Sequence, residues 1–210
     1  MRNKRKKDKI LSYIALFLCV AQVAVMIISW IISATGVGSA TRSLLGAEGI
    51  RWFFGHFVDN LMTPLLVWML ILSIGIGSFI HSGLAEAVKN VFSGVRLSFR
   101  ERIAFRLALI ELFVFVMLIL LLTVIPHAIL LSSTGNLIPS AFSNSLIPII
   151  AFTLCFISVS YGTMAGRLNS MSKVLRSLTV GIAGSLPLWL YYILLTELYC
   201  SLRFSFFSSL

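Results

Sequence analysis

The side chain best placed for chemistry is a single acid inside an apolar run. Glu111 lies within Leu-Ala-Leu-Ile-Glu-Leu-Phe at 107–113, about two helical turns into that run. A charged acid at membrane depth costs about 2.5–3.5 kcal/mol on insertion scales, so it must be protonated, paired or in contact with a wet cavity. One interpretation is a relay for a proton or another cation. The other is a protonated acid near the inner interface, paired with Arg106 or a partner helix. The lack of a second buried acid favours this second interpretation.

A second polar group precedes the second apolar run. Asp59 and Asn60 are followed closely by Thr63 and Pro64. Their side chains could coordinate a cation at the mouth of a pathway. They could equally cap the start of the next helix, since Asp and Asn commonly accept hydrogen bonds from the first backbone N–H groups of a helix. The residue types favour capping.

Other arrangements of reactive residues are missing from the sequence. The three cysteines are scattered, and His56, His81 and His127 lie in different gaps or at different ends of the apolar runs. Neither a disulfide framework nor a zinc site is supported by such spacing. We recognise no nucleophile with a neighbouring base, no phosphate-binding loop and no pair of buried carboxylates. We therefore predict that the chain is not an enzyme and needs no metal or other cofactor.

These residues are distributed over five long apolar runs. A helix rises 1.5 Å per residue, so about 20 apolar residues cross a hydrocarbon layer of about 30 Å. The lengths predict an all-α polytopic integral membrane bundle of about five transmembrane helices. We expect a basic cytoplasmic tail at residues 1–9 and a single membrane domain at 10–210. The expected spans are 10–33, 62–80, 104–131, 146–164 and 178–199.

The charges between the runs predict the orientation. The tail, the gap before the third run and the gap before the fifth hold six, five and three of the 17 Lys and Arg residues. Short loops rich in Lys and Arg stay cytoplasmic, which places the N-terminus inside and the C-terminus outside. The net charge of +10 then follows from topology and from contact with anionic lipid headgroups. We expect a multi-pass protein of a bacterial-type inner membrane, with the lipid bilayer and no nucleic acid as a partner.

Two amphipathic patches lie outside the expected spans. Apolar residues recur at spacings of three and four over 44–58, which predicts a helix lying in the outer interface. A similar pattern over 84–95 predicts a helix on the cytoplasmic surface. Near the C-terminus, Glu197 and Arg203 are expected to form an ion pair at the outer surface.

Proline and glycine positions predict where the helices bend or approach one another. Pro126 predicts a kink or an end in the third helix, and Pro148 fits the tolerant first turn of the fourth. Pro187, in the middle of the fifth run, predicts a kink or a break whose freed backbone groups need partners. Gly75 and Gly77 are expected to let another helix come close.

Two segments resemble a known family. The first contains Glu-Gly-Ile-Arg-Trp at 48–52, Asp-Asn at 59–60, Gly-Ile-Gly at 75–77 and Ser-Gly-Leu at 82–84. The second contains Ser-Leu-Ile-Pro-Ile-Ile at 145–150 and Tyr-Gly at 161–162. In this order the motifs are similar to those of the AbgT family, the p-aminobenzoyl-glutamate transporters. The two segments cover more than half of the chain. Members of the family are longer and carry two re-entrant helical hairpins, for which this chain has no room between Leu84 and Phe142.

The resemblance implies transport of p-aminobenzoyl-glutamate or another aromatic carboxylate, coupled to an ion gradient. In that mechanism Glu111 is the candidate proton carrier. Asn60, which matches an asparagine of the family, and its neighbour Asp59 are polar contacts, and Arg51 attracts an anion at the outer entrance. The family also implies a homodimer. Two alternatives remain open, namely a membrane interaction protein that does not transport, and one part of a split transporter with a complementary membrane subunit.

Overall fold

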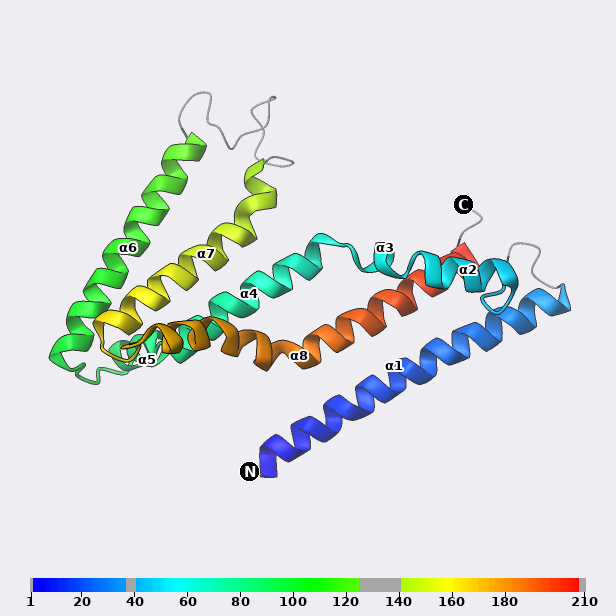
Figure 1. Ribbon diagram of the computed structural model, residues 1–210, viewed down its shortest axis with the longest axis horizontal. Coiled ribbons are helices and arrows are strands. Elements are labelled where there is room, and N and C mark those ends of the chain that lie inside the picture. Colours follow the sequence, from blue (N-terminus) through cyan, green and yellow to red (C-terminus); the bar gives the residue numbers. More distant parts are fainter. Residues whose placement is uncertain (1, 37–40, 125–140, 208–210) are drawn as a thin grey trace. The chain divides into compact units, whose positions relative to one another are not determined.

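The computed structural model describes residues 2–36, 41–124 and 141–207, and in these ranges the chain is helical, without strands (Figure 1). The elements are α1 Arg2–Thr35, α2 Ala47–Gly55, α3 Phe57–Leu61, α4 Pro64–His81, α5 Leu84–Phe92, α6 Phe99–Val124, α7 Ala141–Met164, α8 Met171–Leu202 and a π-helical turn, η1, at Arg203–Phe207. The basic tail is part of α1. The predictions about Pro126 and His127 concern residues outside the described ranges.

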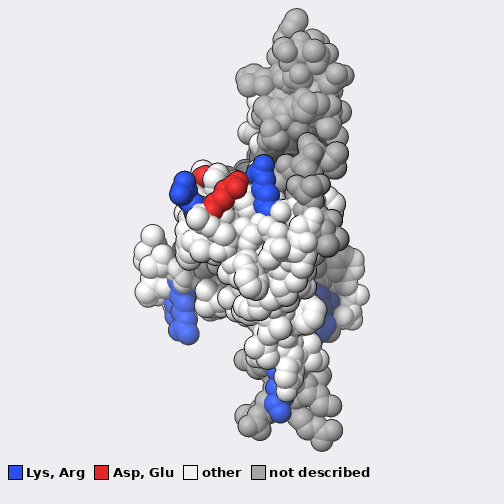
Figure 2. Space-filling view, turned by 90° about the vertical axis from the view of Figure 1, so that its right-hand side faces the viewer, with Lys and Arg blue, Asp and Glu red and all other residues white. Residues whose placement is uncertain are grey.

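Five of these helical stretches are long and apolar enough to cross a membrane, which confirms the predicted all-α membrane class. They are Lys9–Thr35, Pro64–His81, Phe99–Thr123, Ser145–Met164 and Met171–Phe207. Their large apolar side chains are widely exposed, as at Phe17 (70 %) and Phe113 (65 %). Figure 2 shows a described surface that is mostly uncharged. Exposed apolar area costs about 25 cal/mol per Å² in water, a cost that lipid tails remove. The chain is therefore a multi-pass membrane protein.

The chain divides into two compact units. The first unit comprises residues up to 66 together with those from 186 onward, and the second comprises residues 67–185. Helices α4 and α8 contribute residues to both units.

In the second unit, glycines of α4 let two other helices approach closely. A Cβ atom on Gly77 would overlap the backbone of Gly181 in α8, and one on Gly75 would lie 3.1 Å from the carbonyl oxygen of Ala151 in α7. Next to these contacts, Ser78 and Ser177 share a hydrogen bond of 3.3 Å. Small residues and hydroxyl groups are the usual means of packing helices in membranes. The predicted role of both glycines is confirmed.

Helices α6 and α7 lie side by side and antiparallel, with α5 against their lower ends in Figure 1. The α5 helix confirms the helical pattern expected at 84–95. It supplies Leu84 and Ala87 to a buried cluster that also contains Ala104, Ala108, Ile157 and Tyr161. This cluster is the apolar core of the second unit.

Arg167, in the turn between α7 and α8, forms hydrogen bonds with one residue of α5 and one of α6. The Arg167 guanidinium donates to Glu86 at 2.8 Å and to Glu101 at 3.4 Å. The hydrogen bond to Glu86, together with the charge of that carboxylate, raises the pKa of Arg167. Gly83 has a left-handed φ of +84°, and a Cβ atom there would overlap the guanidinium. These exposed ion pairs contribute about 0–1 kcal/mol each and mainly fix the position of the turn.

The two inner prolines lie in helix interiors. Because α7 begins at Ala141, before the apolar run starts, Pro148 is not in the first turn as the sequence predicts. Helix α8 continues through Pro187, so there is no break at that position.

Candidate functional site

Two hydrogen bonds join α1 to the C-terminal part of α8 in the first unit. Tyr191 donates to the carbonyl oxygen of Leu11 at 2.8 Å, and the Gln22 amide donates to the Ser201 hydroxyl at 2.7 Å. The partners advance in the same direction along both helices, so these helices run parallel. Gln22 is the midpoint of the candidate span Lys9–Thr35. Ser201 therefore lies level with the middle of that span.

The segment between α1 and α4 returns along α8 in the opposite direction. Four contacts move toward the N-terminus of α8 as this segment advances: Arg42 N to Ser205 O at 3.1 Å, Trp52 stacked on Phe204 with ring centroids 4.3 Å apart, Asn60 with Glu197, and Thr63 with Tyr192. The sequence predicts a helix at 44–58, and α2 forms within it. Its Trp52 ring packs on η1.

The helical path is interrupted between α3 and α4, at Met62 and Thr63. Pro64 can open α4 because the first helical position needs no N–H donor. The Tyr192 hydroxyl donates to the carbonyl oxygen of Leu61 at 2.8 Å and lies 2.6 Å from the Thr63 hydroxyl. Since a tyrosine has one hydroxyl proton, Thr63 is the donor in the second hydrogen bond. One buried side chain of α8 thus supplies hydrogen-bonding partners to the interrupted backbone, directly before the candidate span that begins at Pro64.

An acid that the sequence assigned to a surface ion pair lies next to this interruption. Glu197 is 4 % exposed, and its Oε2 accepts a hydrogen bond from Asn60 Nδ2 at 3.4 Å. Its Oε1 is buried and has no partner among the described residues. The predicted ion pair with Arg203 is wrong, because Glu197 packs against α3 while Arg203 is exposed. Capping by Asn60 is also wrong, since Asn60 lies within α3 and donates to Glu197.

A polar strip continues from Glu197 along α8 and into η1. Glu197, Ser201 and Ser205 follow one another at intervals of four residues, and all three are buried. Gln22 Oε1 and Ser205 Oγ are, like Glu197 Oε1, buried without a partner in the part of the chain that the structure describes. Gln22 reaches the strip through Ser201. The first unit therefore holds a carboxyl group, that of Glu197, which has spare hydrogen-bonding capacity and forms no ion pair with a described cation.

The predicted proton carrier lies in the second unit. The Ser160 hydroxyl of α7 donates to Glu111 Oε1 at 2.5 Å, and Glu111 Oε2 is buried without a partner among the described residues. The Ser160 hydrogen bond therefore joins α7 to α6. Arg106 is exposed and forms no ion pair with Glu111. The carboxyl is thus held by a neutral donor.

The two remaining predicted residues are on the surface of the first unit. Arg51 in α2 and Asp59 in α3 are both exposed. Four site residues were predicted from the sequence, namely Glu111, Asn60, Asp59 and Arg51. In the first unit, Asn60 is the one of them that forms a hydrogen bond with a buried acid, Glu197. Tyr192 was missed and Glu197 was assigned to a surface ion pair, because both stand toward the end of an apolar run, where the sequence gives no sign of their burial.

The second unit contains an apolar cavity of about 480 Å³ between α4, α5, α6 and α7. Four phenylalanines line it, namely Phe79, Phe92, Phe105 and Phe115, and the buried Thr153 hydroxyl at its wall has no partner among the described residues. No charged side chain is among the residues that line it. The cavity therefore suits an apolar group and lacks a partner for a carboxylate.

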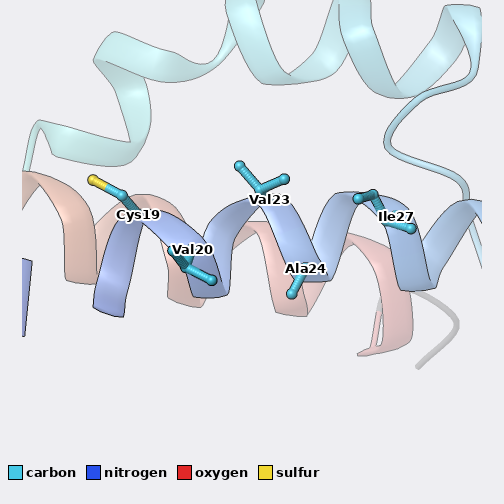
Figure 3. Close-up of a pocket in the computed structure, with 5 residues that line it drawn as sticks. All are labelled: Cys19, Val20, Val23, Ala24 and Ile27. Atoms are coloured by element: carbon cyan, nitrogen blue, oxygen red, sulfur yellow. The ribbon is translucent and has the colours of Figure 1, made fainter. Parts of the chain in front are cut away.

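A shallower depression of about 370 Å³ lies along α1 in the first unit. Figure 3 shows that its five lining side chains, Cys19, Val20, Val23, Ala24 and Ile27, all project from this one helix. Without a hydroxyl, amide or charged group, it offers no specific contact for a polar ligand. The depression is therefore an apolar surface suited to contact with lipid tails.

In the described ranges, no three His, Cys, Asp or Glu residues come together as a metal site.

Comparisons with protein-family models, curated proteins and solved structures find no match. The fold and the site define the class as an all-α multi-pass membrane protein with a buried acid beside an interrupted helix. The AbgT resemblance stays a prediction.

Proposed function

We propose that this chain is a membrane transport protein of the AbgT type. It carries p-aminobenzoyl-glutamate or a related aromatic carboxylate, and an ion gradient drives the uptake. The observation that carries this proposal is the interruption at Met62–Thr63, where Tyr192 supplies a hydroxyl and which the pair Asn60–Glu197 flanks. Many secondary transporters bind their ions and substrates at discontinuous helices. Irregular backbone within a membrane is tolerated where it is buried in protein or lines a water-filled cavity.

Each candidate residue has a role in this proposal. Glu111 carries a proton, and the Ser160 hydroxyl orients its carboxyl. Asn60 is a polar contact at the interruption, beside the exposed Asp59. Arg51, also exposed, attracts the anionic substrate at the outer entrance. The N-terminus lies inside and the C-terminus outside a bacterial-type inner membrane, which agrees with the distribution of Lys and Arg.

The test is uptake of labelled p-aminobenzoyl-glutamate by proteoliposomes that contain the purified chain. A proton gradient imposed across the vesicles should drive uptake above that of protein-free vesicles, and collapse of the gradient with a protonophore should remove the excess. Protease access to the basic tail reports the orientation of the inserted protein. No uptake from correctly inserted protein would sink the proposal of a self-sufficient transporter.

One observation favours the alternative of a partner subunit. The cavity between α4 and α7 is apolar and lacks a charged wall, so it fits the side chains of another membrane helix better than a dicarboxylate. In that case the chain is part of a split transporter or a membrane interaction protein. Native mass spectrometry after mild extraction tests this. A stoichiometric second polypeptide supports the alternative, a mass of two copies supports the homodimer, and a single copy contradicts both assemblies.

A further inference from the structure

We propose that Glu197 is a proton-binding site, with Oε1 as the atom that gains and loses the proton. In this step the carboxylate takes a proton from hydronium and leaves water, while Oε2 keeps the hydrogen bond from Asn60. No bond other than the O–H bond forms or breaks. The biological use of this site rests on the proposed transport function, because it names the proton as the coupling ion at the interrupted helix. Its chemistry does not require transport.

The surroundings of Glu197 provide hydrogen-bonding groups but no compensating charge. From α3 the neutral Asn60 amide donates to Glu197, and from α1 the Gln22 amide donates to Ser201, four residues further along α8. The titratable groups nearby in sequence on its own helix are the Tyr192 hydroxyl, which donates to Leu61, and the Cys200 thiol. The charged residues nearby in sequence, Asp59 and Arg203, are exposed. A buried carboxylate without a partner cation is costly, and the neutral acid avoids that cost.

The depth of the carboxyl strengthens this argument. The contacts of Leu11 with Tyr191 and of Gln22 with Ser201 have sequence separations of 180 and 179 residues. Glu197 therefore lies level with about residue 18 of α1. At 1.5 Å per residue this is about 13 Å along the candidate span from Lys9. Glu197 is also within the candidate span Met171–Phe207, and acids within spans almost always face the bundle interior and commonly mark proton pathways.

A metal cation fits the same strip less well. Cations such as Ca²⁺ take six to eight oxygen ligands. The unpartnered buried oxygens of the described strip are Glu197 Oε1, Gln22 Oε1 and Ser205 Oγ, of which only the first carries a charge. A proton needs one such atom, and Glu197 Oε1 meets this requirement by itself.

The experiment uses dicyclohexylcarbodiimide on the full chain in vesicles of phosphatidylethanolamine and phosphatidylglycerol. This reagent partitions into membranes and reacts with protonated carboxyl groups: the acid proton goes to a nitrogen, the carboxyl oxygen adds to the central carbon, and the adduct rearranges to a stable acylurea. Peptide mass spectrometry should find the adduct on Glu197 at neutral pH, and its yield should fall as the pH is raised. Glu48, whose side chain is 75 % exposed, is the internal control and should stay unmodified.

Three results would overturn the proposal: no adduct on Glu197 at any pH, a yield that does not depend on pH, or protection by sodium ions at constant pH, which would indicate a metal cation site. The Glu197→Gln variant should lose this adduct alone. Should that variant fail to fold, the pH and sodium series on the unmodified chain decide the question. A pH-dependent adduct without any uptake would reject transport and keep the proton site, whereas uptake without an adduct would do the opposite.

Discussion

The Asn60 side-chain nitrogen lies 3.4 Å from Oε2 of Glu197, and so joins the five-residue helix α3 to α8 across 137 positions of sequence. Glu197 has a free oxygen on its other side. This pair places a buried acid beside the interruption of the helical path.

Asn60→Ala should destabilise the protein by about 1–2 kcal/mol. The substitution removes the donor to a buried carboxyl group, which then has no described partner on either oxygen. Unfolding in mixed micelles with a denaturing detergent measures the change. Asp59→Ala, at the exposed neighbouring position, is the matched control and should stay within about 0.5 kcal/mol of the unmodified protein. Equal effects of the two changes would contradict the hydrogen bond.

Tyr192→Phe should destabilise the protein by about 1–3 kcal/mol. The change keeps the ring but leaves the carbonyl oxygen of Leu61 and the hydroxyl of Thr63 without their shared partner. Amide hydrogen exchange should increase at Met62 and Thr63, where the helices are interrupted. Tyr199→Phe, at a position that is 64 % exposed on the same helix, should leave both measurements unchanged.

Gly181→Ala should weaken the packing of α4 on α8 by about 1–3 kcal/mol. The added methyl group would overlap the backbone of Ser73 and Gly77, and overpacking of this kind forces the helices apart. Gly184→Ala on the same helix meets open space within 4 Å and should be neutral or slightly stabilising. Thermal unfolding in detergent compares them, and a stable Gly181→Ala variant would be at odds with the close contact.

Ser160→Ala should affect Glu111 without changing its ionisable group. The carboxyl loses its one described donor, so we expect a destabilisation of about 0.6 kcal/mol and at most about 1.7 kcal/mol, as measured for hydrogen bonds between membrane helices. If the Ser160 hydroxyl orients Glu111 for proton transfer, uptake should fall several-fold while stability changes little. Ser158→Ala, whose hydroxyl bonds to the carbonyl oxygen of Leu154 within its own helix, is the control.

The sequence was sufficient for the class, because the length and apolar character of a run depend only on neighbouring residues. The five spans, the helix at α5 and the close contact at Gly77 follow from such local patterns. The fifth apolar stretch, however, extends from Met171 to Phe207 and is longer than a bilayer requires. Which part of it lies level with α1 is set by distant contacts such as Gln22–Ser201.

The position of α8 relative to α1 explains why the sequence placed Glu197 at a surface. The sequence placed the helix interruption at Pro187 for a different reason. A proline suggests a break by its own chemistry, yet α8 continues through Pro187. The interruption occurs at Met62–Thr63, where Tyr192 supplies a hydroxyl from 131 positions away. Partners at such separation cannot be recognised from the spacing of residues along one segment.

The central claim is that this chain moves an aromatic carboxylate by means of a buried acid. The most direct measurement is proton-driven uptake of labelled p-aminobenzoyl-glutamate by proteoliposomes with the unmodified chain, Glu111→Gln and the surface control Glu48→Gln. We predict uptake that depends on the gradient, that is lost in Glu111→Gln and that is retained in Glu48→Gln. Absence of uptake in all three, or equal uptake in the unmodified chain and Glu111→Gln, would contradict the claim.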